Sequence, residues 1–109
     1  MKTLLLTGFE PFLHFTSNPT MRIVQELHNQ VVGEYKIHSE VLPVDFRKSG
    51  VQLLELLEDI KPDAVISLGL AGGRYKITPE RIAINVNDGE ADNSGNILVD
   101  ETIHAEGQD

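Results

Sequence analysis

The sequence predicts an α/β fold, with a doubly wound, mostly parallel sheet flanked by helices. Two apolar runs, 3–7 and 64–68, are nearly unbroken, which is typical of strands buried on both faces of a parallel sheet. Two segments with apolar residues at helical spacing lie between the strand candidates. The order strand, helix, strand, helix, strand predicts right-handed crossovers within one domain over residues 1–109.

The first strand is expected over Thr3–Thr7, and a helix is expected to follow at about Pro19–Val32. Asn18 is a typical N-cap, and Pro19 suits the first helical position, where its missing N–H costs nothing. Gly33 is expected to end this helix. Its apolar stripe is Met21, Ile23, Val24, Leu27, Val31 and Val32.

A second strand and a second helix are expected at Tyr35–Leu42 and about Arg47–Ile60. The strand ends before Pro43 and the helix before Pro62. A third buried strand is expected at Ala64–Leu68. The inner face of the second helix is predicted to be Val51, Leu53, Leu54, Leu57 and Ile60.

The last third of the chain changes to a period of two. Ile82, Ile84 and Val86 alternate with polar or small residues, which predicts a strand with one apolar face. The segment Asp92–Asn96 is rich in turn formers and precedes Ile97–Val99, so a hairpin is expected there.

Charge and composition exclude several classes of partner. The chain has 9 basic and 17 acidic residues, and its net charge of −8 repels nucleic acid and anionic membrane surfaces. No apolar run approaches the roughly 20 residues of a membrane span. The sequence contains no cysteine, hence no disulfide, thiolate metal site or thiol nucleophile. These features predict a cytoplasmic protein.

The loops after the strands are the expected site, because ligands bind beyond the carboxyl ends of parallel strands. Phe9 and Phe12 follow the first strand, where they either wall a small ligand or cap the core. Asn18 either caps its helix alone or also presents its amide to a ligand. The local pattern favours the cap alone.

Two further segments have competing interpretations. Gly69–Arg74 matches no nucleotide motif, and a tight connection that needs positive φ is the favoured explanation. If a strand begins at Glu80, its carboxylate lies on an apolar face and needs a partner, for example a catalytic imidazole. From spacing alone, a solvated strand start or an ion pair with Arg74 or Arg81 is favoured.

The sequence predicts no metal site. The histidines, His14, His28, His38 and His104, show no metal-ligand spacing. The acidic segment 88–92 lacks the glycine and distal glutamate of an EF-hand loop.

Three motifs together resemble type I pyroglutamyl peptidase, also called pyrrolidone-carboxylate peptidase. They are Thr7–Phe12 with Asn18 and Pro19, Gly69 with Ala71–Arg74, and above all Ile77–Asn85. The resemblance spans nearly the whole chain. The family implies a phosphorylase/hydrolase-like α/β fold and a homo-oligomer. It also implies a cysteine peptidase, an omega-peptidase, which removes N-terminal pyroglutamyl residues from peptides through a Cys, His and Glu triad without cofactors.

The resemblance assigns a role to each matching residue. At Glu80 it favours the catalytic interpretation over a solvated strand start or an ion pair. Glu80 becomes the catalytic group that orients the imidazole, Phe9 and Phe12 become walls for the lactam ring, and Asn18 a polar contact to it. The main chain of Gly69 and Leu70 is also expected to face the ring. At position 70 relatives can carry a polar side chain, so only the main chain of Leu70 transfers.

The family's nucleophile is missing from these 109 residues, and His104 does not fit the family's histidine motif. We therefore expect a chain truncated at the C-terminus, inactive alone, with an exposed sheet edge and exposed apolar helix faces. The alternative is a non-enzymatic small-ligand binding or interaction module that has lost the catalytic Cys and His. A weaker alternative is a mononucleotide-binding, flavodoxin-like domain.

Overall fold

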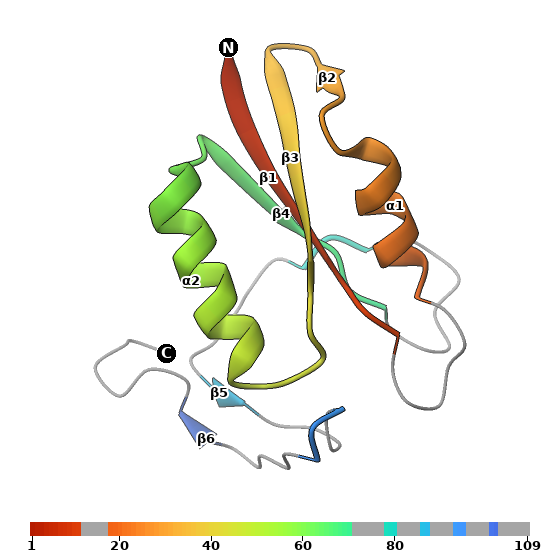
Figure 1. Cartoon of the computed structure of the whole chain (residues 1–109), viewed down its shortest axis with the longest axis vertical. Helices are drawn as coiled ribbons and strands as arrows, with labels where there is room; N and C mark the ends of the chain where they lie inside the picture. Colours follow the sequence, from red (N-terminus) through yellow and green to blue (C-terminus); the bar gives the residue numbers. More distant parts are fainter. Residues whose placement is uncertain (12–17, 71–77, 81–85, 88–92, 96–100, 103–109) are drawn as a thin grey trace.

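The computed structural model describes residues 1–11, 18–70, 78–80, 86–87, 93–95 and 101–102, and eight elements lie within these ranges (Figure 1). In chain order they are β1 (Lys2–Phe9), α1 (Pro19–Leu27), β2 (Val31–Val32), β3 (Tyr35–Leu42), α2 (Lys48–Ile60), β4 (Ala64–Ser67), β5 (Val86–Asn87) and β6 (Glu101–Thr102). None of the described helices is long and apolar enough to cross a membrane.

β1 lies at the centre of a four-stranded sheet with the order β2-β3-β1-β4. It pairs in parallel with β3 over its whole length, from Lys2 opposite Tyr35 to Phe9 opposite Leu42. It also pairs in parallel with β4, whereas the short β2 is antiparallel to β3. The mostly parallel sheet predicted from the sequence is therefore confirmed.

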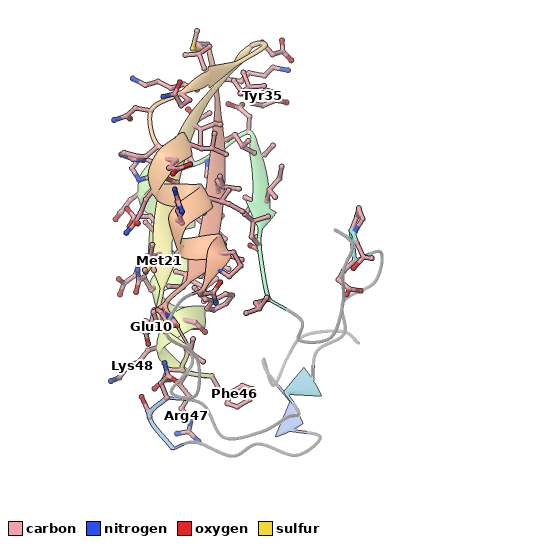
Figure 2. The ribbon with its side chains drawn as sticks, turned by 90° about the vertical axis from the view of Figure 1, so that its right-hand side faces the viewer. Glu10, Met21, Tyr35, Phe46, Arg47 and Lys48 are labelled. Atoms are coloured by element: carbon pink, nitrogen blue, oxygen red, sulfur yellow. The ribbon has the colours of Figure 1, made fainter. Side chains whose placement is uncertain are left out.

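The two helices lie on opposite faces of this sheet, as Figure 1 and the perpendicular view in Figure 2 show. The chain moves from β1 to β3 through α1 and then reverses direction, through α2, to reach β4 on the other side of β1. Right-handed crossovers in opposite directions place successive helices on opposite faces. The doubly wound arrangement is thus confirmed for the described elements.

The hydrophobic core lies between the sheet and α1. Leu6, Val24 and Ile37 form a buried cluster, against which further apolar side chains pack from β1, β3 and the end of β4. Because side chains alternate along a strand, Leu5 and Thr7 lie on the opposite face of β1. Both are fully buried. This agrees with the prediction that the first strand is covered on both faces.

The start of α1 is as predicted, and its end is not. The Asn18 side chain accepts the Thr20 N–H at 2.9 Å, so the N-cap is confirmed. The helix ends at Leu27 rather than Val32, because the chain turns back toward β3 with Asn29 at φ 66°. The segment Val31–Val32 is not helical, but pairs with Tyr35 and Lys36 as β2.

Gly33 was expected to end the first helix and instead belongs to the turn between β2 and β3. Its φ is 59°, a left-handed conformation that glycine adopts without a steric cost. The β-branched valines before it fit an edge strand better than a last helical turn. Of the apolar stripe predicted for α1, only Val24 is fully buried.

The bounds of α2 agree with the prediction, but the burial of its inner face does not. The helix ends at Ile60, and the next residue, Lys61, has a left-handed backbone (φ 49°) and donates its N–H to Leu57 O just before Pro62. No residue of α2 is buried, and the side chains of Val51 and Leu54 are 57% and 60% exposed. Within the described residues the helix makes little contact with any strand except β3.

β4 has the predicted position but is not the buried strand that was expected. Val65 and Ile66 point to opposite faces of the sheet, and they are 43% and 48% exposed. Apolar residues thus reach solvent on both faces of the last described strand of the main sheet. This matches the exposed edge and helix faces that the family resemblance implied.

The last third of the chain contains a small antiparallel ribbon. β5 and β6 pair through Val86 with Thr102 and through Asn87 with Glu101. Residues 93–95 form the predicted turn, with Gly95 at φ 83°. The predicted strand positions Ile82 and Ile84 and the hairpin strand Ile97–Val99 lie outside the described residues.

Candidate functional site

The candidate site lies at the edge of the sheet where the three parallel strands end. β1, β3 and β4 run in the same direction, so the segments after Phe9, Leu42 and Ser67 meet at this edge. Figure 2 shows Glu10 and Phe46 at this end of the sheet, next to the start of α2. Such loops form the ligand site in open α/β sheets.

The end of β1 is fixed against the first turn of α1. The main-chain N–H of Phe9 donates to Thr20 Oγ1 at 3.0 Å, and this hydroxyl donates to Asn18 Oδ1 at 2.6 Å. Gly8 lies so close to α1 that a Cβ at this position would be 2.7 Å from the Thr20 carbonyl oxygen. The position of Phe9, a predicted wall of the pocket, therefore depends on a glycine and a buried threonine.

Asn18 is only 3% exposed, and its amide braces the protein itself. Its oxygen accepts hydrogen bonds from the N–H and the hydroxyl of Thr20, and its nitrogen donates to Glu10 O at 3.4 Å. Thus the cap interpretation is confirmed. A contact between Asn18 and a lactam ring remains a prediction.

Gly69 and Leu70 follow β4 at the same edge. The prediction of a positive φ in this connection is wrong at Gly69, whose φ is not positive. Gly72 and Gly73 lie outside the described residues. Among the described residues, no heavy atom other than those of Gly69 and its two chain neighbours lies within 4 Å of the position that a Gly69 Cβ would occupy. The main chain at Gly69 is therefore open, and Leu70 beside it is 39% exposed.

The structure leaves two of the predicted site residues without a defined role. Phe12 lies outside the described residues. Glu80 is described and is exposed in this chain, but it is not part of a strand, and residues 81–85 are outside the described ranges. The strand start at Glu80, which was to turn its carboxylate toward an apolar face, is therefore not observed. Its catalytic role stays a prediction from the resemblance.

The sequence interpretation missed a polar cluster at this edge, formed by Glu10, Asp45 and Asn93 with their neighbours. Asp45 is 5% exposed, and its Oδ1 accepts the N–H groups of Arg47 and Lys48 at 2.8 Å each, at the start of α2. An aspartate three residues before the first residue of a helix is a signal for such a cap. No local sequence pattern predicts the contact between Glu10 and Asn93, because the two residues are 83 positions apart in the sequence.

The pKa of the Asp45 carboxyl lies below its ordinary value. The first cause is the hydrogen bond from the Lys48 N–H, and the second is a hydrogen bond from the Ser94 side chain. Burial acts in the opposite direction. The ionised carboxylate is therefore the form that this edge of the sheet requires.

The two described histidines lie away from this edge. His38 is opposite Leu5 in the middle of the sheet and pairs with Glu40, its Nε2 lying 3.1 Å from Oε1. His28 packs edge-on against His38 and accepts the Ser39 N–H through Nδ1. Within the described part of the chain, no three His, Cys, Asp or Glu side chains form a group that could hold a metal ion.

Fold and site together define a doubly wound α/β domain whose polar and aromatic residues gather at the carboxyl edge of its sheet. The sequence profile described as pyroglutamyl peptidase matches residues 1–109. The chain belongs to the pyroglutamyl peptidase family.

Curated relatives and solved structures agree with this assignment. The pyrrolidone-carboxylate peptidase of Lysinibacillus sphaericus is 56% identical over 109 residues, which are 100% of this chain and 53% of the relative. The crystal structure of Bacillus amyloliquefaciens pyroglutamyl peptidase I matches with a TM-score of 0.91 and 44% identity, over 98% of this chain and 52% of that one. Pyrrolidone carboxyl peptidase from Thermococcus litoralis matches with a TM-score of 0.93 and 41% identity, over 98% of this chain and 49% of that one. The chain thus spans about half the length of the relatives it matches.

Proposed function

We propose that this chain forms the N-terminal part of a cysteine peptidase domain that removes pyroglutamyl residues from the N-termini of peptides. The observation that carries the proposal is the family match over residues 1–109, which includes the segment around Glu80. In the proposed reaction a thiolate paired with histidine attacks the pyroglutamyl carbonyl and expels the peptide amine. Water then hydrolyses the acyl-enzyme, and Glu80 orients the imidazole throughout.

The pocket for the pyroglutamyl ring is proposed at the carboxyl edge of the sheet. The ring is small and uncharged, so apolar walls from Phe9 and Phe12 with a few amide hydrogen bonds suit it. Two features support this placement: the fixed position of the Phe9 main chain, and the Gly69 main chain, which the described residues leave uncovered. Asn18, which is buried and linked to the Phe9 N–H through the Thr20 hydroxyl, completes the proposed pocket.

In this mechanism the nucleophile comes from a polypeptide segment outside these 109 residues, since the chain contains no cysteine. The imidazole is placed there too, because His104 does not fit the family's histidine motif. The described sheet has a suitable place for such a segment. Val65 and Ile66 expose apolar surface on both faces of β4, and Val51 and Leu54 do so on α2. A strand that is apolar on both faces is typical of the interior of a larger parallel sheet, where other elements cover both faces. We propose that the remaining part of the family domain packs here.

The proposal also includes a cytoplasmic location and homo-oligomeric assembly. A chain without cysteine needs no oxidising compartment for its folding. Light scattering coupled to size-exclusion chromatography measures the oligomeric state of the complete protein. A monomer at micromolar concentration would contradict the proposed homo-oligomer.

The test uses an extended form, in which this chain is followed by the part of the Lysinibacillus sphaericus relative beyond its match. We expect the extended form to hydrolyse a chromogenic pyroglutamyl amide and to lose this activity after treatment with iodoacetamide. The 109-residue chain alone is expected to give no turnover. A prolyl amide is the matched control substrate, since its ring lacks the lactam carbonyl. Cleavage that resists alkylation would overturn the thiol mechanism.

The absence of cysteine also favours a second function, a non-catalytic module that binds a small neutral ligand at the same edge. In that case the extended form gives no turnover, whereas titration with the neutral amide of pyroglutamic acid shifts the NMR signals of Phe9 and Gly69. Turnover by the extended form decides for the peptidase.

A further inference from the structure

Glu10 and Asn93 join three segments of the chain at the carboxyl edge of the sheet. The Glu10 carboxylate accepts the Val44 N–H at 3.0 Å and the Asn93 side-chain amide at 3.3 Å, both through Oε1. The same Asn93 amide donates to Pro11 O at 2.9 Å, and the Asn93 N–H donates to Val44 O at 2.8 Å. The segment after β1, the segment after β3 and the turn at 93–95 thus meet through these two side chains.

The carboxylate matters here because it is an acceptor for two donors from different segments. Glu10 is half-buried, and so is Asn93, whereas Val44 is only 8% exposed. A hydrogen bond to an ionised group is stronger than one between neutral groups, and a buried N–H without a partner is costly. Without Glu10, the Val44 N–H loses its acceptor.

Separate contacts hold the two residues on either side of Glu10 in the sequence. Phe9, before it, is held by Thr20, and Pro11, after it, is held by Asn93. The Glu10 main chain is itself paired, because its N–H donates to Leu42 O. The chain is therefore anchored both before and after Glu10, at the point where it leaves β1 and begins the segment with the predicted phenylalanine walls.

We propose that Glu10, held by Asn93, is a positioning residue for the pyroglutamyl pocket, an inference that rests on the proposed function. Glu10 does not touch the substrate. It keeps the segment after β1 in the one position that presents Phe9 to the ring. Its loss weakens substrate binding, and the reaction at the carbonyl proceeds from the bound state as before.

The test compares Glu10→Ala, Glu10→Gln, Asn93→Ala and the double variant Glu10→Ala/Asn93→Ala in the extended form. Glu10→Gln is the conservative variant, since its amide oxygen still accepts both N–H groups. We expect Glu10→Ala to raise KM about tenfold with kcat changed less than about threefold, as for a lost ground-state contact. Glu10→Gln should stay within about threefold of the unsubstituted form in both constants. The double variant should lose less than the sum of the two single variants, because the two side chains share one contact, from the Asn93 amide to Glu10 Oε1.

Amide hydrogen exchange at Val44 is the second readout and needs no catalytic activity. We expect exchange at this amide to be about tenfold faster in Glu10→Ala and unchanged in Glu10→Gln. A drop in kcat at constant KM, or a Glu10→Gln variant as impaired as Glu10→Ala, would overturn the positioning role. If the unsubstituted extended form shows no turnover, the proposed function fails, and unchanged Val44 exchange in Glu10→Ala then refutes the contact by itself.

Discussion

Gly8 of β1 lies directly against the main chain of Thr20 in α1. A Cβ on Gly8 would be 2.7 Å from the Thr20 carbonyl oxygen and 2.9 Å from the carbonyl carbon. Both distances are too short for non-bonded atoms, and neither backbone can move freely, since Thr20 also binds the Phe9 N–H. The glycine thus allows the strand and the helix to meet next to the candidate pocket.

The first prediction concerns this contact. Gly8→Ala should lower the free energy of unfolding of the extended form by about 1–3 kcal/mol, because the added methyl group forces β1 and α1 apart. Urea denaturation followed by circular dichroism measures the change. Gly69→Ala is the matched control: within the described part of the chain its Cβ meets no atom within 4 Å beyond its chain neighbours, and its φ is not positive. The free energy of unfolding of this variant should not decrease. Equal midpoints for Gly8→Ala and the unsubstituted protein would contradict the contact.

The second prediction follows from Asp45 and concerns acid stability. Hydrogen bonds from the Lys48 N–H and from Ser94 hold the pKa of this carboxyl below the unfolded-state value of about 3.9. A lowered pKa in the folded state means that the ionised form stabilises the protein above this value, and that the stabilisation is lost as the pH falls through the folded pKa. The thermal midpoint should therefore fall between about pH 5 and pH 3 in part through Asp45.

The variant Asp45→Asn tests this interpretation. Asparagine is an equally good cap at neutral pH but does not titrate, so the variant should show a smaller loss of thermal midpoint between pH 5 and pH 3. Ser94→Ala removes the second cause of the lowered pKa and should give an intermediate pH dependence. Identical pH curves for all three proteins would rule out Asp45 as a source of the acid sensitivity.

Local signals in the sequence predicted the starts of the elements better than their ends. Asn18 and Pro19 define the first residue of α1 through short-range contacts alone. The end of α1 depends on β3, since Val31 and Val32 continue the apolar helical pattern but find strand partners at Lys36 and Tyr35. Tertiary pairing overrode the local pattern here.

The candidate site was predictable where it depends on strand ends and a sequence motif. The parallel order placed Phe9 and Gly69 at one edge of the sheet, and the structure agrees. The bond between Glu10 and Asn93 was not predictable, because it joins residues far apart in sequence whose types are common in loops. The exposure of Val65 likewise depends on which layers cover β4.

The third prediction tests whether β4 is where the rest of the family domain packs. The second half of the Lysinibacillus sphaericus relative, supplied as a separate polypeptide, should bind this chain and restore hydrolysis of the pyroglutamyl amide. Val65→Asp should weaken this association at least tenfold, because it places a charge in an apolar contact. Isothermal titration calorimetry and the recovered turnover measure the effect.

Val32→Asp in β2 is the matched control for this prediction. Val32 is also a valine in a strand, 59% exposed compared with 43% for Val65, but it lies at the opposite edge of the sheet. Both variants of the free chain should keep the circular dichroism spectrum of the unsubstituted chain, since both side chains reach solvent. Equal binding by the two variants would place the contact elsewhere.

The last prediction concerns Glu80 and the proposed triad. In the extended form, Glu80→Gln should lower kcat/KM about 10²–10⁴-fold, because the imidazole loses the carboxylate that orients it and stabilises its charged form. A less stable imidazolium also raises the pKa of the paired thiol, so the acid limb of the pH profile should move to higher pH. Glu34→Gln is the control: Glu34 is an exposed carboxylate, 3.2 Å from Lys2 Nζ, and that surface pair contributes at most about 1 kcal/mol. It should retain full activity. A Glu80→Gln enzyme with more than about a tenth of the activity and an unshifted pH profile would show that another group orients the histidine.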